Sequence, residues 1–254
     1  MTPLQQRMRE DLQLRGLSAR TQEMYSRAVY QLAAHYRKSP DQITEEELRD
    51  YFLYLKNVKH YSRRASTIAL CGIKFFYEHT RKREWSTLTF VRALREKRLP
   101  VILSVAEVRT ILAHLKLLRY RVCLTTIYSC GLRLQEGTHL QVPDIDSARM
   151  LVHGRCGKGA KDRYVPLPPR TLELLRQDWK THRHLIWLFP APGRGGIGMA
   201  TASEPMPSNS VQDAFRAALT PSGMHKHASV HTLRHSYATH LLEAGVHLRL
   251  IQEY

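Results

Sequence analysis

The sequence predicts a mainly α-helical protein of two domains with one small β-hairpin. Apolar residues recur every three or four positions along most of the chain, which is the spacing of one face of an α-helix. Residues 149–167 depart from that spacing and instead predict a strand, a glycine-containing turn and a second strand. A basic, weakly periodic stretch at 81–100 separates two helical regions, and 254 residues are enough for two domains. We therefore expect domains at 1–98 and 99–254.

Four helices are expected in the first domain. The first lies near residues 4–14, and Ser18 can cap the second. Thr44 and Glu47 form a capping box at the start of the third helix, because each side chain can satisfy one free backbone N–H of the first turn. Ser62 opens the fourth helix. Methionine and aromatic residues keep helical spacing in this region, so we expect them in the core rather than stacked on bases.

The second domain is expected to begin with another capping box, formed by Ser104 and Glu107. Helices are expected at 104–117, 119–130, around Arg133, at 170–184, at 209–219 and at 231–244. The hairpin lies among them, with strands near 149–153 and 162–167. Residues 190–207 are rich in Gly, Pro and Ser and predict a surface loop. No strand precedes this loop and no Lys-Ser/Thr follows it, which excludes a Walker-type phosphate loop.

The chain is strongly basic, with 39 Lys and Arg against 22 Asp and Glu and a formal net charge of +17. The excess is spread along the chain, because residues 1–100 carry 20 basic and 11 acidic side chains and residues 101–254 carry 19 and 11. This distribution predicts a nucleic-acid-binding protein that contacts phosphate from both halves. A ribosomal protein or another basic protein is the alternative. The periodic helices and the 43% hydrophobic content argue against a disordered basic arm.

Other features exclude several classes of protein. No signal peptide opens the chain and no run approaches the ~18 apolar residues of a membrane span, so we expect a cytoplasmic protein without membrane contact. The four cysteines form no C-x-x-C pair and are expected to be reduced thiols, mostly in the core: Cys71, Cys123, Cys130 and Cys156. Five of the 14 histidines lie at 225–240, without zinc-finger or H-E-x-x-H spacing. We therefore predict no metal and no cofactor.

Three segments of the second domain carry the functional pattern. The first is Cys-Gly-Leu-Arg-Leu-Gln-Glu at 130–136, followed by Val-Pro-Asp-Ile-Asp at 142–146. The second is Gly-Arg-Cys-Gly-Lys-Gly-Ala-Lys-Asp-Arg-Tyr-Val-Pro-Leu at 154–167. The third is Val-His-Thr-Leu-Arg-His-Ser-Tyr-Ala-Thr-His-Leu-Leu-Glu-Ala-Gly at 230–245. In order and spacing these segments resemble the three boxes of the tyrosine recombinase (phage integrase) family, especially its Xer-like, transposon and integron branch. The resemblance covers residues 1–254 and is most specific in the second half.

The third segment shows how much the resemblance adds to the residues alone. His231 and Arg234 lie one turn apart on a helix, beside an apolar stripe that must face a core. By itself this pattern fits a solvated helix edge as well as it fits a site.

The resemblance implies a catalytic phosphate site. Arg133 and Arg234 would clamp the scissile phosphate, because a planar guanidinium forms paired hydrogen bonds to phosphate oxygens and stays charged. Lys158, in a Gly-Lys-Gly turn of the hairpin, would protonate the leaving 5′-oxygen, and His231 would position or deprotonate the attacking hydroxyl. Glu136, one turn after Arg133, would hold that guanidinium in place. His235 is expected to be a packed or hydrogen-bonded side chain instead of a catalytic one.

Contacts with DNA outside this site are expected from further cations, for each of which an ordinary solvated side chain is the alternative. They are Arg63, Arg64, Lys74, Lys161 and Arg163.

The nucleophilic tyrosine of the family is not recognisable in the sequence. In the family, a Leu-Gly-His segment follows the third box and the tyrosine comes several residues later. Here Tyr254 lies 20 residues after Arg234, where the family pattern carries an aliphatic residue just before Leu-Gly-His. Tyr254 is therefore not assigned as the nucleophile. We expect an integrase truncated before that segment.

The function implied is site-specific DNA recombination through a 3′-phosphotyrosyl intermediate, with residues 1–254 binding DNA but not cutting it. The expected partner is double-stranded DNA with specific recombination sites, on which the full-length relative would assemble as a homo-oligomer. One alternative is a non-catalytic protein that competes for recombination sites. Another is a structural nucleoid protein with affinity indifferent to sequence.

Overall fold

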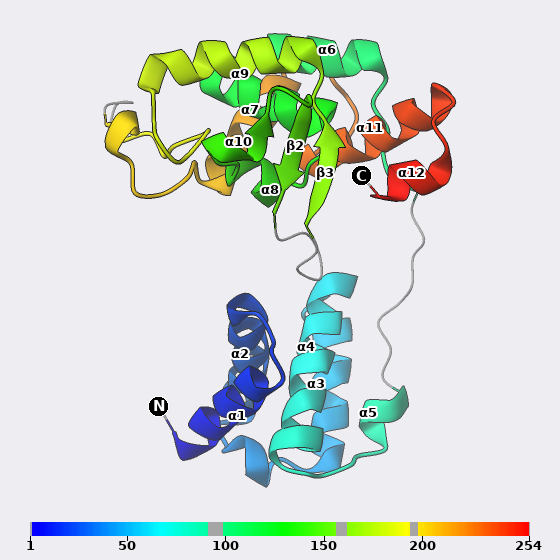
Figure 1. Cartoon of the computed structure of the whole chain (residues 1–254). Helices are drawn as coiled ribbons and strands as arrows, with labels where there is room; N and C mark the ends of the chain where they lie inside the picture. Colours follow the sequence, from blue (N-terminus) through cyan, green and yellow to red (C-terminus); the bar gives the residue numbers. More distant parts are fainter. Residues whose placement is uncertain (1, 91–98, 156–161, 194–197, 254) are drawn as a thin grey trace. The chain divides into compact units, whose positions relative to one another are not determined.

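The chain divides into two compact units, Met1–Arg98 and Leu99–Tyr254. The computed structural model describes residues 2–90, 99–155, 162–193 and 198–253 of them (Figure 1). The predicted class, mainly α with a small β-sheet, is confirmed. No helix in these described ranges is both long enough and apolar enough to cross a bilayer.

The first unit is built from four longer helices, each with a capped start. They are α1 (Pro3–Leu14), α2 (Ala19–Tyr36), α3 (Glu45–Asn57) and α4 (Arg63–Phe75). Shorter helical turns complete it: η1 (Pro40–Gln42), η2 (Phe76–Thr80) and α5 (Thr87–Phe90). The side chains of Ser18 and Ser62 cap α2 and α4, and Thr44 and Glu47 form the predicted capping box of α3.

The core of the first unit lies among these helices and is lined by fully buried Leu12, Leu32, Leu48, Ile73 and Tyr77. Helices α2 and α4 cross closely at Gly72, where an added Cβ would lie 2.9 Å from the Cα of Tyr25. A larger residue would separate the two helices, whose adjoining surfaces carry several arginines.

The second unit consists mainly of helices arranged around one central helix. Its helical elements are α6 (Val105–Ala113), α7 (Leu118–Ser129), α8 (Leu134–Thr138), η3 (Val142–Asp144), α9 (Pro169–His182), η5 (Met199–Thr201), α10 (Ser208–Leu219), α11 (Val230–Glu243) and α12 (Leu248–Glu253). Helix α7 contacts α6, α8, α9, α10 and α11, and its Val122, Leu124 and Ile127 are fully buried. Ser104 and Glu107 form the predicted capping box of α6.

A three-stranded antiparallel sheet in the order β1-β2-β3 lies against this helical core. Its strands are β1 (Ile145–Asp146), β2 (Leu151–Gly154) and β3 (Arg163–Pro166). Val152 and Val165 pair across β2 and β3 and are both fully buried. The sequence predicted the hairpin but neither the short β1 nor α12.

Candidate active site

Two of the three sequence boxes interlock at Gly131. The guanidinium of Arg234, on α11, donates a hydrogen bond to the carbonyl oxygen of Gly131. Gly131 has a φ of 60°, and an added Cβ would lie 2.3 Å from ring atoms of Tyr237, one turn after Arg234. The position therefore requires glycine both for its backbone conformation and for the close approach of the ring. This contact places Arg234 next to the segment that carries Arg133.

Arg133 and Glu136 form a reciprocal capping arrangement at the start of α8. The backbone N–H of Arg133 donates to Glu136 Oε2 at 2.8 Å, and the Arg133 guanidinium donates to Oε1. The carboxylate is nearly enclosed, with 5% of its side chain exposed, whereas the Arg133 side chain is 37% exposed. Glu136 thus fixes one end of the Arg133 guanidinium while the rest of that group remains accessible.

Arg163, the first residue of β3, forms a two-pronged contact with the same carboxylate. Its two terminal nitrogens donate to Oε1 and Oε2 of Glu136 at 2.8 and 2.7 Å. Only 14% of its side chain is exposed. The sequence placed Arg163 among the residues expected to contact DNA, but the structure directs its guanidinium to Glu136.

The electrostatics of this cluster follow from burial and hydrogen bonding. Burial alone would raise the pKa of Glu136, but hydrogen bonds from Arg163 and Arg133 outweigh it and lower this pKa to about 2. The pKa of Arg234 is lowered by burial and then by the nearby charges of Arg163 and Arg133. The three arginines therefore lie close enough to repel one another, and they form a positively charged site around one carboxylate.

His231 begins the exposed edge of α11, one turn before Arg234. Among the described residues, none forms a hydrogen bond with its imidazole ring. The expectation that His235 is packed or hydrogen-bonded is wrong, because this residue is exposed one turn further along the helix. Lys158 and Lys161, both predicted from the second box, lie outside the described residues, as does Tyr254.

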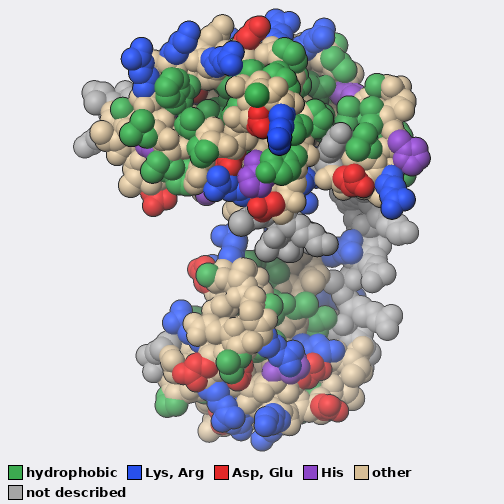
Figure 2. Space-filling model, viewed as in Figure 1, with side chains coloured by type: hydrophobic (Ala, Val, Ile, Leu, Met, Phe, Trp, Pro, Cys, Tyr) green, Lys and Arg blue, Asp and Glu red, His purple; other side chains and the backbone are tan. Residues whose placement is uncertain are grey.

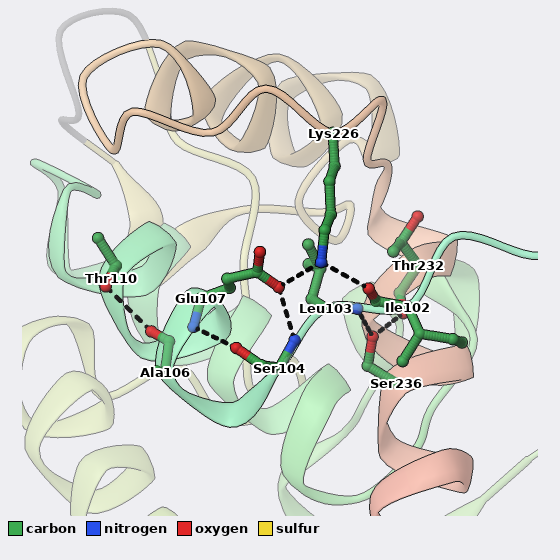
Figure 3. A network of polar contacts seen from close by, with 9 residues as sticks. All are labelled: Ile102, Leu103, Ser104, Ala106, Glu107, Thr110, Lys226, Thr232 and Ser236. Atoms are coloured by element: carbon green, nitrogen blue, oxygen red, sulfur yellow. Dashed lines mark hydrogen bonds and ion pairs between the residues drawn. The ribbon is translucent and has the colours of Figure 1, made fainter.

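Helix α11 is also anchored through Ser236 to the segment that precedes α6 (Figure 3). The fully buried Ser236 hydroxyl accepts a hydrogen bond from the Leu103 N–H at 2.9 Å and donates to the Thr232 carbonyl at 2.8 Å. Nearby, Lys226 Nζ lies 2.8 Å from Glu107 Oε2 and 3.2 Å from the carbonyl oxygen of Ile102. The bond between Ser236 and Leu103 restrains the rotation of α11, the helix that carries Arg234. The role of Ser236 could not be predicted from the sequence, because its partner lies 133 positions away.

The base of the hairpin is held by a second buried carboxylate. Asp144 accepts hydrogen bonds from the backbone N–H of Gln141 at 2.8 Å and from Arg155 Nε. His153 of β2 lies 3.6 Å from the same carboxylate. Asp144 therefore connects the segment after α8 to the strand that leads into residues 156–161.

The first unit carries a basic groove between α2 and α4. Two adjoining hollows of about 610 and 290 Å³ share Met24 and Ile68 in their linings. Arg63 and Arg64 line the first hollow, as predicted cations, and Arg20 and Arg27 line the second. Lys74 does not line this α2–α4 groove, and its side chain forms an ion pair with Glu78 at 3.3 Å. The pattern that could have revealed Arg20 and Arg27 is their seven-residue spacing, which places both on one face of α2.

Lys and Arg side chains appear on the visible surfaces of both units (Figure 2). Within the part of the chain that the structure describes, no three His, Cys, Asp or Glu side chains are placed to share a metal ion.

Comparison with known proteins assigns both units. Residues 4–87 match the N-terminal SAM-like domain of phage integrases, and residues 101–254 match the phage integrase family. An integrase/recombinase homologue of Sinorhizobium fredii is 40% identical over 253 residues, which is 99% of this chain and 80% of that protein. The chain belongs to the tyrosine recombinase family.

Other relatives agree with this assignment. The tyrosine recombinase XerC of Syntrophus aciditrophicus is 32% identical over 219 residues, 79% of this chain and 67% of that protein. The crystal structure of XerA recombinase has 25% identity and a TM-score of 0.53, and covers 98% of this chain and 87% of its own. A lambda integrase dimer bound to a COC′ core site has the same fold, with a TM-score of 0.74 at 18% identity over 98% of this chain and 92% of that one.

Proposed function

We propose that this tyrosine recombinase binds double-stranded DNA through both units and supplies the phosphate-binding part of a site for site-specific recombination. The observation that carries the proposal is the meeting of Arg133 and Arg234 around Gly131 and Glu136. Arg133 and Arg234 are about 100 positions apart in sequence, and placing two like charges together does not stabilise the fold. A shared anionic ligand accounts for the arrangement.

Each member of the site has a chemical task in this proposal. Arg133 and Arg234 stabilise the negative charge that builds up on the five-coordinate phosphate. His231, exposed one turn from Arg234, positions the attacking hydroxyl. Lys158 protonates the 5′-oxygen that leaves when the phosphorus–oxygen bond breaks. The chemistry needs no metal ion, because the guanidinium groups supply the positive charge.

The α2–α4 groove is the proposed DNA-binding surface of the first unit. Fluorescence anisotropy of a labelled duplex, repeated over a range of salt concentrations, tests it. A variant with Arg20, Arg27, Arg63 and Arg64 all changed to Ala should bind more weakly, and its slope of log K against log[salt] should fall by about 0.9 per lost phosphate contact. The control is Lys74→Ala with Arg49→Ala, which removes two charges, both ion-paired outside the groove. An equal loss per removed charge in both variants would show that only net charge matters.

The proposal for residues 1–254 by themselves is DNA binding without cleavage. Covalent catalysis requires a hydroxyl held in line with the leaving oxygen, and Tyr254 occupies a position where the family pattern has an aliphatic residue. A nicked suicide duplex carrying a cognate site should therefore yield no covalent protein–DNA adduct. An adduct that disappears in Tyr254→Phe would make Tyr254 the nucleophile. Specific binding without an adduct also supports the alternative of a protein that competes for recombination sites.

A further inference from the structure

We propose that Arg163 is a positioning residue that neutralises Glu136 and so leaves Arg133 free to bind the phosphate. This inference rests on the proposed function of Arg133. The two oxygens of Glu136 accept four hydrogen bonds, two of which come from Arg163 at 2.8 and 2.7 Å. Arg133 supplies the other two, one from its backbone N–H and one from its guanidinium. Arg163 thus provides most of the side-chain contact with this carboxylate.

Arg163 is poorly placed to bind DNA itself. Its side chain is 14% exposed, against 37% for Arg133, and both of its terminal nitrogens already bind Glu136. Its Nε is buried and has no hydrogen-bond partner among the described residues. The exposed part of the site therefore belongs to Arg133, and Arg163 lies behind it.

The charge balance explains why the second arginine matters. Arg133, Arg163 and Arg234 bring three positive charges to a site with one enclosed carboxylate, Glu136. A buried carboxylate that stays ionised at neutral pH needs a cationic partner. Without Arg163, Arg133 would be the nearest remaining partner and would turn further toward Glu136. The site would then lose one unit of positive charge and also the guanidinium nitrogens that face the phosphate.

The same contact connects the hairpin to the arginine site. Arg163 pairs with Gly154 across β2 and β3, and these two residues flank the segment that carries Lys158. A two-pronged guanidinium–carboxylate contact fixes orientation as well as distance. The position of the hairpin strands and the direction of Arg133 are therefore coupled through Glu136.

A double-mutant cycle on the 254-residue chain tests the proposal, with inorganic phosphate as the probe. Arginine side-chain NMR resonances of Arg133 and Arg234 report its binding. Arg163→Met should weaken phosphate binding by about 5- to 10-fold, since one nearby charge is lost and Arg133 is withdrawn. Adding Glu136→Gln removes the carboxylate charge, so the double variant should recover affinity to within about 2-fold of the starting protein. A merely structural role for Arg163 predicts no such recovery.

Glu136→Gln alone completes the cycle, and two further variants serve as controls. Arg155 lies at the base of the hairpin and contacts Asp144 instead of Glu136. Arg155→Met removes the same charge as Arg163→Met, but it should change phosphate binding by less than about 2-fold. Arg163→Lys keeps the charge and loses the two-pronged contact, so its phosphate affinity should lie between those of the starting protein and Arg163→Met. If Arg163→Met does not fold, Arg163→Lys takes its place and should bind phosphate more weakly than the starting protein. NMR titration of the Glu136 carboxyl should also show a higher pKa in Arg163→Met than in the starting protein.

The outcomes separate this proposal from the one on which it rests. Phosphate binding that Arg163→Met leaves unchanged, or a double variant no better than the single one, would overturn the role of Arg163 alone. An absence of phosphate binding at Arg133 and Arg234 in the starting protein would overturn the phosphate site and both proposals together.

Discussion

Two buried carboxylates in the second unit are equally enclosed, yet their pKa values shift in opposite directions. The side chains of Glu136 and Asp178 are each 5% exposed. Hydrogen bonds from Arg163 and Arg133 lower the pKa of Glu136 to about 2 against the effect of burial. At Asp178, on α9, burial dominates and raises the pKa to about 6, with Arg119 only partly offsetting it.

The difference shows that burial alone does not mark a functional site. Asp178 lies 3.9 Å from His182, but burial lowers the pKa of that histidine, so the two do not form an ion pair near neutral pH. Glu136 instead sits among guanidinium groups that outnumber it. A surplus of opposite charge around a carboxylate leaves capacity for an external anion, whereas a deficit leaves only a cost to stability.

The largest effect is expected from Glu136→Gln. Its folded-state pKa lies below the unfolded value, so the carboxylate stabilises the fold above about pH 4.5 and this contribution disappears as pH falls toward about 2. The substitution should lower the free energy of unfolding at pH 7 by about 3 kcal/mol. Urea unfolding at several pH values measures this. A loss that stays constant down to pH 3 would show that the charge of Glu136 is not responsible.

Gly131→Ala should have the next largest effect, because it disturbs the other contact of the same site. The new Cβ would meet the Tyr237 ring at 2.3 Å and the residue would have to keep a φ of 60°. We expect a loss of about 2–3 kcal/mol in the free energy of unfolding. Gly16→Ala is the matched control, since Gly16 has a φ of 65° and open space around it, and should lose about 1 kcal/mol. Equal losses would mean that the close approach of Tyr237 contributes nothing.

Asp178→Asn should change stability in the opposite direction. The folded-state pKa of Asp178 lies above the unfolded value, so its charged form destabilises the fold at neutral pH, and this cost fades as pH falls through about 6. The substitution should raise the free energy of unfolding at pH 7 by about 1–2 kcal/mol and leave it unchanged near pH 4. Asp213→Asn, at an exposed ion pair with Arg216, is the control and should have little effect. A destabilised Asp178→Asn would contradict the comparison.

The sequence predicted the helices and the hairpin because periodicity and capping residues are local patterns, as at Ser104 and Glu107. It also placed Glu136 beside Arg133, since a contact three positions apart needs no knowledge of the fold. It did not predict that Arg163 binds Glu136 or that Ser236 binds Leu103, because these partners lie 27 and 133 positions apart. Only tertiary structure brings such residues together. Asp178 gave no recognisable pattern at all, because nothing local distinguishes a buried aspartate from an exposed one.

The smallest effect is expected from Lys226→Met, which extends the comparison to a partly exposed carboxylate, Glu107. Glu107 resembles Glu136 in that a hydrogen bond from a cation, Lys226, lowers its pKa. The Lys226 side chain is 45% exposed and the Glu107 side chain is 27% exposed, so water screens their interaction. Losing it should cost at most about 0.5 kcal/mol in the free energy of unfolding at physiological salt, and less in 1 M salt. Ser236→Ala, which removes the buried bond to Leu103 in the same network, should cost about 1 kcal/mol regardless of salt. A loss above about 1.5 kcal/mol for Lys226→Met would show that pairing governs carboxylate energetics here without regard to burial, and the contrast between Glu136 and Asp178 would then need another cause.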